Sequence, residues 1–260
     1  MNNSTTWALV TGASAGLGVE FARQLAKKGH SLILVARRGD RLEQLSIELK
    51  KQYAIDSVIL VEDLSSAGAA SRIVSALARD AIVPDVLVNN AGFGLQGDAI
   101  DLSIERQAEM IRLNIGALTE LALAIGQQMA VAKRGAILNV ASTAGFQPVP
   151  GMAVYGATKS YVIYFSMALS NELSKHGVHV VALCPGITKT DFFQANGVSF
   201  RAPDFLSMTA EKCVALGIRA IEKKRPLAIT GWINKVVAFL ARMTPLRILT
   251  VVSGKVARSR

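Results

Sequence analysis

The chain has 260 residues, 51% of them apolar, which suits one large domain with a substantial core. Two cysteines are too few for a disulfide framework, and three histidines at positions 30, 176 and 179 show no metal-ligand spacing, so no metal site is expected. The net charge of +10 is concentrated at one end: residues 219–260 carry ten Lys or Arg against one acid, whereas residues 1–218 carry 19 basic and 18 acidic residues.

Short apolar runs alternate with amphipathic stretches along the chain. The runs are typical of buried strands and cover residues 7–12, 30–37, 57–64, 85–92, 135–142 and 179–186. Helical spacing of apolar residues predicts helices over 19–29, 40–52 with Asp40 as its N-cap, 67–79, about 103–130 and 153–175. Because the strands show no polar face, helices must cover both sides of the sheet. The pattern predicts an α/β fold, a single-domain Rossmann-type doubly wound parallel sheet in three αβα layers.

The stretch TGASAGLG, residues 11–18, joins the first strand to the first helix. Gly12 allows a tight turn, Gly16 lets the backbone approach a phosphate, and Gly18 lets the helix pack closely on the sheet. Ser14 adds a hydroxyl donor, and Leu17 is expected with this loop among the cofactor-binding residues. The free N–H groups at the helix N-terminus attract a pyrophosphate. The alternative is a tight turn without a ligand.

The second strand ends in VARRGD, where an NAD-preferring site usually has an acid. Arg37 and Arg38 instead suit a 2′-phosphate, since guanidinium groups bind phosphate through paired hydrogen bonds, and this favours NADP(H). Either arginine could also point into solvent. At the end of the third strand, Asp63 and Leu64 fall at the ligand-binding edge; Asp63 either accepts a hydrogen bond from adenine or caps the next helix.

Tyr155 and Lys159 are four residues apart in a predicted helix and so share one face. An ammonium near a phenol stabilises the tyrosinate, so we expect Lys159 to lower the pKa of Tyr155 toward neutrality. Ser142, just past the fifth strand, either hydrogen-bonds the same substrate oxygen or caps a turn. The combination favours reversible hydride transfer between a carbonyl or alcohol and a nicotinamide.

Taken in order, TGASAGLG, NNAG at 89–92, Asn114, Ser142, Tyr155-x-x-x-Lys159 and Pro185-Gly186 followed by Thr188 resemble the short-chain dehydrogenase/reductase family over roughly residues 5–230. The resemblance implies that Tyr155 is the acid/base, that Lys159 lowers its pKa and holds the nicotinamide ribose, and that Ser142 orients the carbonyl. The resemblance also implies a relay-water site and two groups of cofactor-contacting residues. Asn114 would position a relay water, Asn90, Ala91 and Gly92 would line the ribose, and Pro185, Gly186, Ile187 and Thr188 would contact the nicotinamide end.

Several of these residues also have structural alternatives. Asn114 could be only a helix-kink residue, and Asn89 and Asn90 are more typical of structural than of chemical roles. Cys184 and Cys213 lie in apolar surroundings and are expected to be buried free thiols.

The substrate end of the predicted catalytic domain, residues 1–230, contains an expected lid at about 187–210. Phe192, Phe193, Phe200 and Phe205 fall in this stretch, which favours an apolar ketone or secondary alcohol, such as a 3-oxoacyl chain or a steroid-like molecule. The closer resemblance is to DltE-like reductases and to the long-chain 3-oxoacyl reductase/17β-hydroxysteroid dehydrogenase branch. A catalytically silent NADP-sensing protein of the same fold is the alternative function.

Residues 231–260 form an expected basic amphipathic extension. The apolar residues of 231–254 alternate with Lys235, Arg242 and Arg247, which suits a helix packed on a sister subunit, over the pocket, or at a membrane surface. No signal peptide or spanning run is evident, so we expect a cytoplasmic protein, with peripheral membrane contact as an alternative, and no nucleic-acid partner. The resemblance also implies a homodimer or homotetramer that pairs through helix 153–175.

Overall fold

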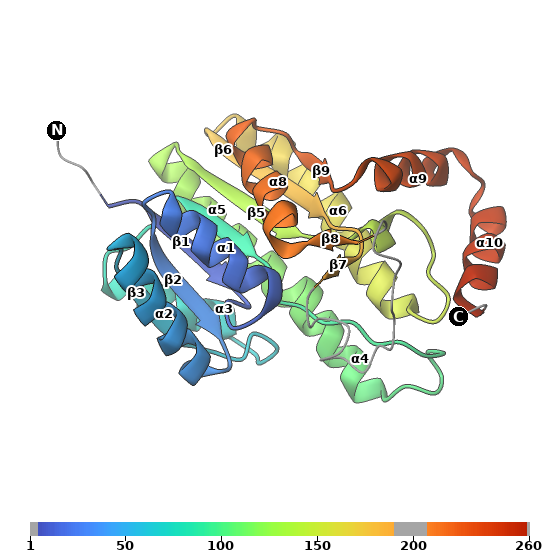
Figure 1. The fold of residues 1–260 in the computed structure, drawn as a ribbon, viewed down its shortest axis with the longest axis horizontal. Coiled ribbons are helices and arrows are strands. Elements are labelled where there is room, and N and C mark those ends of the chain that lie inside the picture. The colour runs from blue at the N-terminus through green and yellow to red at the C-terminus, as the bar shows by residue number, and fades with distance from the viewer. Residues whose placement is uncertain (1–4, 190–206, 259–260) are drawn as a thin grey trace.

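The computed structural model describes residues 5–189 and 207–258 of the chain, with side chains up to residue 254. Seven parallel strands form the main sheet in the order β3-β2-β1-β4-β5-β6-β9 (Figure 1). The strands are β1 Trp7–Thr11, β2 Ser31–Ala36, β3 Ser57–Val61, β4 Val86–Asn89, β5 Gly135–Val140, β6 Val178–Cys184 and β9 Leu227–Ile229. The predicted doubly wound parallel sheet is confirmed, and β9 is a seventh strand that the sequence reading missed.

The helices before β6 match the predicted set, with one difference at a cap. They are α1 Gly16–Lys27, α2 Gly39–Tyr53, α3 Ala69–Arg79, α4 Ile104–Ile111, the π-helical turn η1 Arg112–Ala117, α5 Leu118–Ala132, the short 3-10 turn η2 Thr143–Phe146 and α6 Ala153–Ser174. The prediction of Asp40 as N-cap is wrong, because α2 begins one residue earlier with Arg38 as its N-cap. Asp40 lies in the first turn, where its charge still favours the helix dipole.

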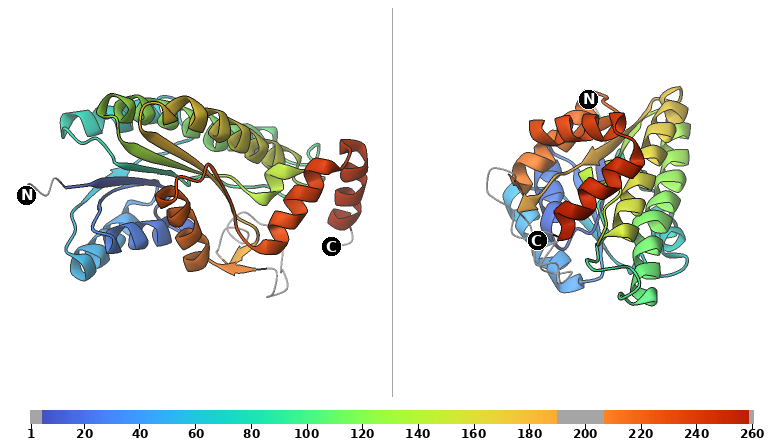
Figure 2. Two further views of the ribbon diagram at one scale, coloured as in Figure 1. Left: turned by 90° about the horizontal axis from the view of Figure 1, so that it is seen from above. Right: turned by 90° about the vertical axis from the view of Figure 1, so that its right-hand side faces the viewer.

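Helices cover both faces of the sheet, which explains why its strands are apolar throughout (Figure 2). Leu9 and Ile33 pack with α3, α5 and α6 on one face, whereas Val10 and Leu34 pack with α1, α2 and α8 (Ala210–Glu222) on the other. Because successive side chains of a strand alternate between faces, both sets must be apolar. The result is the predicted three-layer αβα arrangement.

The helical stretch Ile104–Ala132 is long and apolar enough to cross a bilayer by length and composition, the one such stretch in the part of the chain that the structure describes. In the fold it packs instead against β4, β5 and α3, as helices of a three-layer α/β fold do. This packing accounts for its apolar composition without a membrane.

The expected lid at about 187–210 lies mostly outside the described residues. Its two ends, β7 Thr188–Lys189 and β8 Met208–Thr209, pair as a short parallel ribbon beside the main sheet. The expected helix with breaks at Gly197 and Pro203 is among the residues not described.

The C-terminal extension consists of two helices rather than one. They are α9 Trp232–Met243 and α10 Leu246–Arg258, separated at Thr244-Pro245, where the missing N–H of proline ends a helix. Figure 1 shows both helices at the far end of the molecule from the N-terminus. Because β9 runs parallel to its neighbours, α9 starts at the carboxyl edge of the sheet.

Candidate active site

A cleft of about 520 Å³ opens along the carboxyl edge of the sheet. This is the edge where parallel α/β sheets bind ligands. All predicted site residues line the cleft except Gly18, Asn114 and Ile187. Additional lining residues that the sequence reading did not name are Arg41, Glu62, Phe93, Arg106, Leu113, Val140 and Ala141.

Glycine is required at two positions of the loop between β1 and α1. A Cβ at Gly18 would lie 2.1 Å from the carbonyl oxygen of Gly12, and Gly12 itself has φ +66° and would place a Cβ 2.8 Å from Asn90 Nδ2. Gly18 therefore acts through packing, as the sequence predicted, but it does not line the cleft as its expected place among the cofactor-binding residues requires. The N-terminus of α1 has no side-chain cap and no acid in its first turn, so it can accept an anion.

Thr11, which the sequence reading did not name, ties this loop to β4. Its hydroxyl accepts hydrogen bonds from the backbone N–H groups of Asn90 at 2.9 Å and Ala91 at 3.0 Å. The Asn90 side chain returns a hydrogen bond to the Thr11 carbonyl at 2.9 Å. Asn90 is thus structural, as expected, and holds the strand end that lines the cleft. A buried threonine at the end of an apolar strand is the signal that could have identified it.

Arg38 does not simply point into solvent. Its guanidinium donates hydrogen bonds to the hydroxyl and the carbonyl of Ser14, at 3.0 Å and 3.1 Å from Nη2. Arg37 pairs with Asp63 at 3.9 Å and with Glu109 at 3.7 Å. Both arginines line one end of the cleft, together with Arg41. The cationic end suits an anionic group such as a phosphate.

Asp63 does not cap the next helix, one of the two alternatives for it, because α3 has Gly68 as its N-cap and no side-chain cap hydrogen bond; Asp63 instead stabilises the turn that follows β3. Its Oδ1 accepts hydrogen bonds from the backbone N–H of Ser65 at 2.9 Å and from the Ser65 hydroxyl at 2.7 Å. Burial raises the pKa of Asp63, but the hydrogen bonds from Ser65 and the charge of Arg37 outweigh it, and the net shift is downward. Asp63 still lines the cleft, and the neighbouring Leu64 is buried there.

Ser142 and Tyr155 meet at the other end of the cleft. Ser142 caps η2, accepting a hydrogen bond from the Ala144 N–H at 3.1 Å, and also hydrogen-bonds Tyr155. Tyr155 and Lys159 lie on the first turns of α6 and are both buried. Lys159 Nζ donates to the Val140 carbonyl at 2.8 Å and lies 5.8 Å from the centroid of the Tyr155 ring. The predicted trio is therefore brought together.

The pKa of Tyr155 moves opposite to the expected direction. Burial raises it to about 12, and the hydrogen bond with Ser142 only partly opposes this rise. Burial also lowers the pKa of Lys159 to about 8. The expected lowering of the Tyr155 pKa toward neutrality is therefore not found, because loss of hydration is the largest cause and only the hydrogen bond with Ser142 opposes it.

Asn114 lies inside η1, so the expected helix distortion is present. Its Oδ1 accepts from the Phe93 N–H at 3.1 Å, and its Nδ2 donates to the Phe93 carbonyl at 2.9 Å and to Thr158 Oγ1 at 3.1 Å. A Cβ placed on Gly92 would lie 2.8 Å from Asn114 Oδ1 and 3.7 Å from Lys159 Nζ. Both side chains therefore lie next to Gly92, and π-helical turns are frequent at functional sites.

At the last part of the cleft, Pro185, Gly186 and Thr188 line its wall. Thr188 Oγ1 donates to the Gly186 carbonyl at 3.1 Å, and Gly186 N donates to Thr230 Oγ1 at 3.1 Å. Ile187 does not line the cleft; its carbonyl accepts from the Met208 N–H at 2.9 Å.

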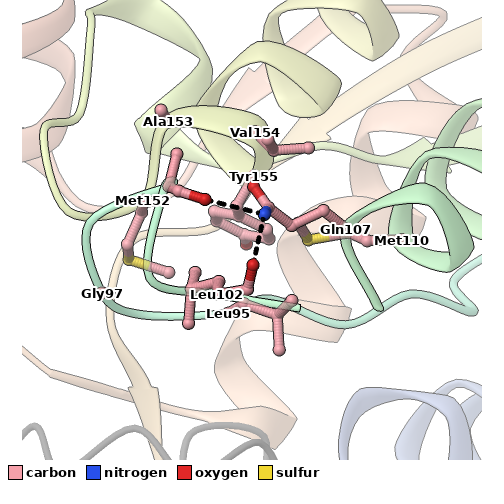
Figure 3. Close-up of a pocket in the computed structure, with 10 residues that line it drawn as sticks. Leu95, Gly97, Leu102, Gln107, Met110, Met152, Ala153, Val154 and Tyr155 are labelled. Carbon is pink, nitrogen blue, oxygen red and sulfur yellow. Dashed lines mark hydrogen bonds between the residues drawn. The ribbon is translucent and has the colours of Figure 1, made fainter. Parts of the chain in front are cut away.

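A second, narrow space lies beside Tyr155 (Figure 3). Leu95, Leu102, Met110 and Met152 surround it, and Gln107 donates to the Leu102 carbonyl across it at 3.1 Å. The space has no room for a water molecule. The residues around it therefore pack against the ring of Tyr155, and the space does not hold a ligand.

The short chain dehydrogenase family model matches residues 6–198. The chain belongs to the short-chain dehydrogenase/reductase family. It is therefore an oxidoreductase that acts on carbonyl or alcohol groups, as the sequence resemblance implied.

Individual relatives agree with this assignment. The very-long-chain 3-oxoacyl-CoA reductase of Homo sapiens is 32% identical over 188 residues, which cover 71% of this chain and 60% of that protein. A short-chain dehydrogenase from Sphingobium yanoikuyae, solved in complex with NADPH, has a TM-score of 0.83 at 32% identity and covers 92% of this chain and 94% of its own. The bulky-bulky ketone specific alcohol dehydrogenase from Comamonas testosteroni has a TM-score of 0.79 at 29% identity, with 92% of each chain covered.

Proposed function

We propose that this short-chain dehydrogenase/reductase is an NADP(H)-dependent reductase of apolar ketones, with Tyr155 as its proton donor. One observation carries the proposal: a single cleft contains both the Ser142, Tyr155 and Lys159 side chains and a cluster of arginines. Ser142 and Tyr155 are hydrogen-bonded to each other, and Lys159 lies beside them. A reductase needs both ends, one for the phosphates and one for proton transfer.

The residues of the cleft fit the cofactor. Gly12 and Gly16 line the cleft without side chains that would cover the loop backbone, and the uncapped start of α1 suits the pyrophosphate. Arg38 and Ser14, already hydrogen-bonded to each other, would hold the 2′-phosphate with Arg37. Pro185, Gly186 and Thr188 would hold the nicotinamide end. When bound, NADPH supplies a hydride to the carbonyl carbon of the substrate.

The chain's own residues supply the proton and stabilise the charge. With a pKa of about 12, the Tyr155 phenol carries its proton at neutral pH and can give it to the forming alkoxide. Ser142 would donate a hydrogen bond to the same oxygen. The tyrosinate that remains would then be stabilised by the ammonium of Lys159. At neutral pH the phenol is thus in the protonated form that the reductive reaction uses.

The relatives support a large apolar substrate. One acts, by its name, on very-long-chain 3-oxoacyl-CoA, and another is specific for bulky-bulky ketones. The four phenylalanines of the expected lid agree with this, although they lie outside the described residues. We include a 3-oxoacyl chain and a steroid-like ketone as the two substrate types to compare.

The test is a panel of long-chain 3-oxoacyl, steroidal, bulky aryl and polar sugar ketones, assayed with NADPH and with NADH side by side. We expect oxidation of NADPH with the apolar ketones and at least a tenfold preference for NADPH over NADH, roughly the value of one lost charged contact. Equal rates with both cofactors would contradict the role of the arginines. NADPH binding with no turnover of any ketone would favour the sensor function instead.

We also propose that the protein pairs through α5 and α6. Apolar side chains are exposed there, including Leu123 on α5 and Tyr164 and Met167 on α6. Large exposed apolar patches on a folded surface are typical of interfaces. Light scattering coupled to size exclusion should give a dimer or tetramer mass, and a monomer mass at micromolar concentration would contradict the proposal.

A further inference from the structure

The helix α9 turns its largest apolar side chains toward solvent. Its buried positions are the small residues Ala238 and Ala241, whereas Trp232, Phe239 and Met243 are 74%, 63% and 71% exposed. A helix of a soluble domain normally buries its large apolar side chains and exposes its polar ones. The reversed arrangement leaves a surface without an occupant among the residues that the structure describes.

Most of the exposed large apolar residues of α9 form one continuous stripe, and Val237, 46% exposed, lies beyond its edge. At about 100° per residue, Trp232, Val236, Phe239, Leu240 and Met243 fall within an arc of roughly 100° on α9. Lys235 and Arg242 fall along one edge of that arc, so the apolar stripe has a basic border. Arg242 also lies over the ring of Phe146, 5.4 Å from its centroid, which holds α9 to the body of the molecule.

The helix α10 extends the same kind of surface. Leu246, Ile248, Val251 and Val252 are exposed, and only Leu249 among its described large apolar residues is buried. Figure 2 shows α9 and α10 as the outermost elements at their end of the molecule. We call the exposed apolar residues of α9 and α10 together the C-terminal stripe.

Charge decides among the partners that could cover the stripe. No Asp or Glu occurs from Lys223 to Arg260, a segment with nine Lys or Arg. In a two-fold symmetric pair of copies the same basic patch would face itself, so like charges would oppose the contact. A nucleic acid would neutralise the charge but leave the large apolar side chains in water. An anionic bilayer satisfies both features, with apolar side chains in the interface and basic groups at the lipid headgroups.

We propose that the C-terminal stripe binds the surface of anionic lipid bilayers. The binding is peripheral: the two helices lie in the plane of the interface, and the α/β body stays outside it.

The stripe is physically joined to the active site. Asn234 of α9 donates to the Thr230 carbonyl at 2.7 Å, and the Thr230 hydroxyl accepts from the N–H of Gly186 in the cleft wall. On α10, a Cβ at Gly254 would lie 3.5 Å from Pro150, in the segment that leads into α6. Membrane binding would thus set the cleft close to the bilayer. This consequence, which rests on the proposed function, identifies the ketone substrate as one that partitions into lipid.

The binding test uses the full chain and sedimentation with vesicles of phosphatidylcholine, with or without phosphatidylglycerol. We expect binding to the anionic vesicles that weakens about tenfold or more without the anionic lipid or in high salt. Trp232 is one of two tryptophans, so a Trp7→Phe variant leaves it as the reporter. Its emission should shift to the blue on addition of anionic vesicles, because it enters an apolar interface.

A paired substitution separates the stripe from general hydrophobicity. Phe239→Gln with Met243→Gln should reduce vesicle binding about tenfold or more, since both residues contribute buried apolar area. The control, Ile47→Gln with Ile100→Gln, changes two apolar residues elsewhere on the surface that are 69% and 93% exposed, and this variant should bind as the unchanged chain does. NADPH binding, followed by its fluorescence, should be equal in all variants.

Three results would overturn the proposal. The first is no binding to anionic vesicles, and the second is equal vesicle binding by the stripe variant. The third is that the chain does not bind vesicles but either binds duplex DNA or forms an oligomer that the stripe substitutions dissociate. Because the vesicle assay needs no turnover, a failed ketone panel leaves its outcome unaffected.

Discussion

The ammonium of Lys159 lies 5.8 Å from the centroid of the Tyr155 ring, one turn along the same helix. Both groups are buried, and burial disfavours the charged form of each. It raises the pKa of the phenol to about 12 and lowers the pKa of the ammonium to about 8. At pH 7 the phenol is protonated and the ammonium is mostly charged. This is the protonation state that a proton donor in carbonyl reduction requires.

The first prediction follows from these two pKa values. For reduction, kcat/KM should be flat below pH 7 and fall as pH rises through about 8, because Lys159 loses the charge that stabilises the tyrosinate. For oxidation of the alcohol, the rate should rise with pH, because that direction needs the ionised phenol. Both profiles can be measured from nicotinamide absorbance.

Two lysine variants test the assignment of the break near pH 8. Lys159→Met should remove it along with much of the rate, whereas Lys50→Met, at an exposed surface pair with Asp56, should keep it. A break that persists in Lys159→Met would assign it to another group.

The second prediction concerns cofactor choice. Arg38 donates to Ser14 on the glycine-rich loop, so Arg38→Ala should raise the KM for NADPH about tenfold or more and leave that for NADH nearly unchanged. Arg79 is exposed in the last turn of α3 and is not among the residues that line the cleft, so Arg79→Ala serves as the matched control. Equal losses with both cofactors would indicate a structural role for Arg38.

The third prediction compares two helical glycines. A Cβ at Gly18 would meet the Gly12 backbone at 2.1 Å, so Gly18→Ala should destabilise the fold by at least about 1–3 kcal/mol and weaken cofactor binding. A Cβ at Gly116 would meet nothing within 4 Å, so Gly116→Ala should be neutral or stabilising by up to about 1 kcal/mol. Urea unfolding followed by circular dichroism measures both, and equal effects would refute the packing argument.

The fourth prediction concerns three buried polar side chains that are joined by hydrogen bonds beneath the active site. Asn139 on β5 accepts from Asn89 at 2.9 Å and donates to Ser166 of α6 at 2.9 Å, and all three are buried. Asn139→Ala should cost about 1–3 kcal/mol of stability, because it leaves polar partners unpaired. Since Ser166 lies on the helix that carries Tyr155, kcat should fall as well. Unchanged stability would mean that water replaces the amide.

Most of the fold could be predicted because the signals are local. The first six strands are apolar runs of five residues or more, apart from β4, and the glycine loop marks the first turn. The strand β9 has three residues and no such run, so it could not be identified. The break between α9 and α10 had a local signal in Pro245, which the sequence reading passed over.

The parts of the site that could not be predicted depend on tertiary structure. Arg41 and Arg106 reach the cleft because α2 and α4 begin near it, and nothing in the spacing of these residues indicates this. Asn114, inside the π-helical turn, is held by hydrogen bonds with Phe93 and Thr158, which are distant in sequence. The direction of the Tyr155 pKa shift depends on burial, and a Tyr–Lys spacing gives no information about burial.

The measurement that tests the central claim most directly is Tyr155→Phe, assayed for NADPH binding and for turnover of the best ketone of the panel. The substitution removes one hydroxyl from a ring that is otherwise held in place. The account predicts unchanged NADPH affinity and a fall in kcat of about 10²–10⁴-fold, the range for loss of a general acid. Turnover within about twofold of the unchanged chain would contradict the role of Tyr155 as proton donor.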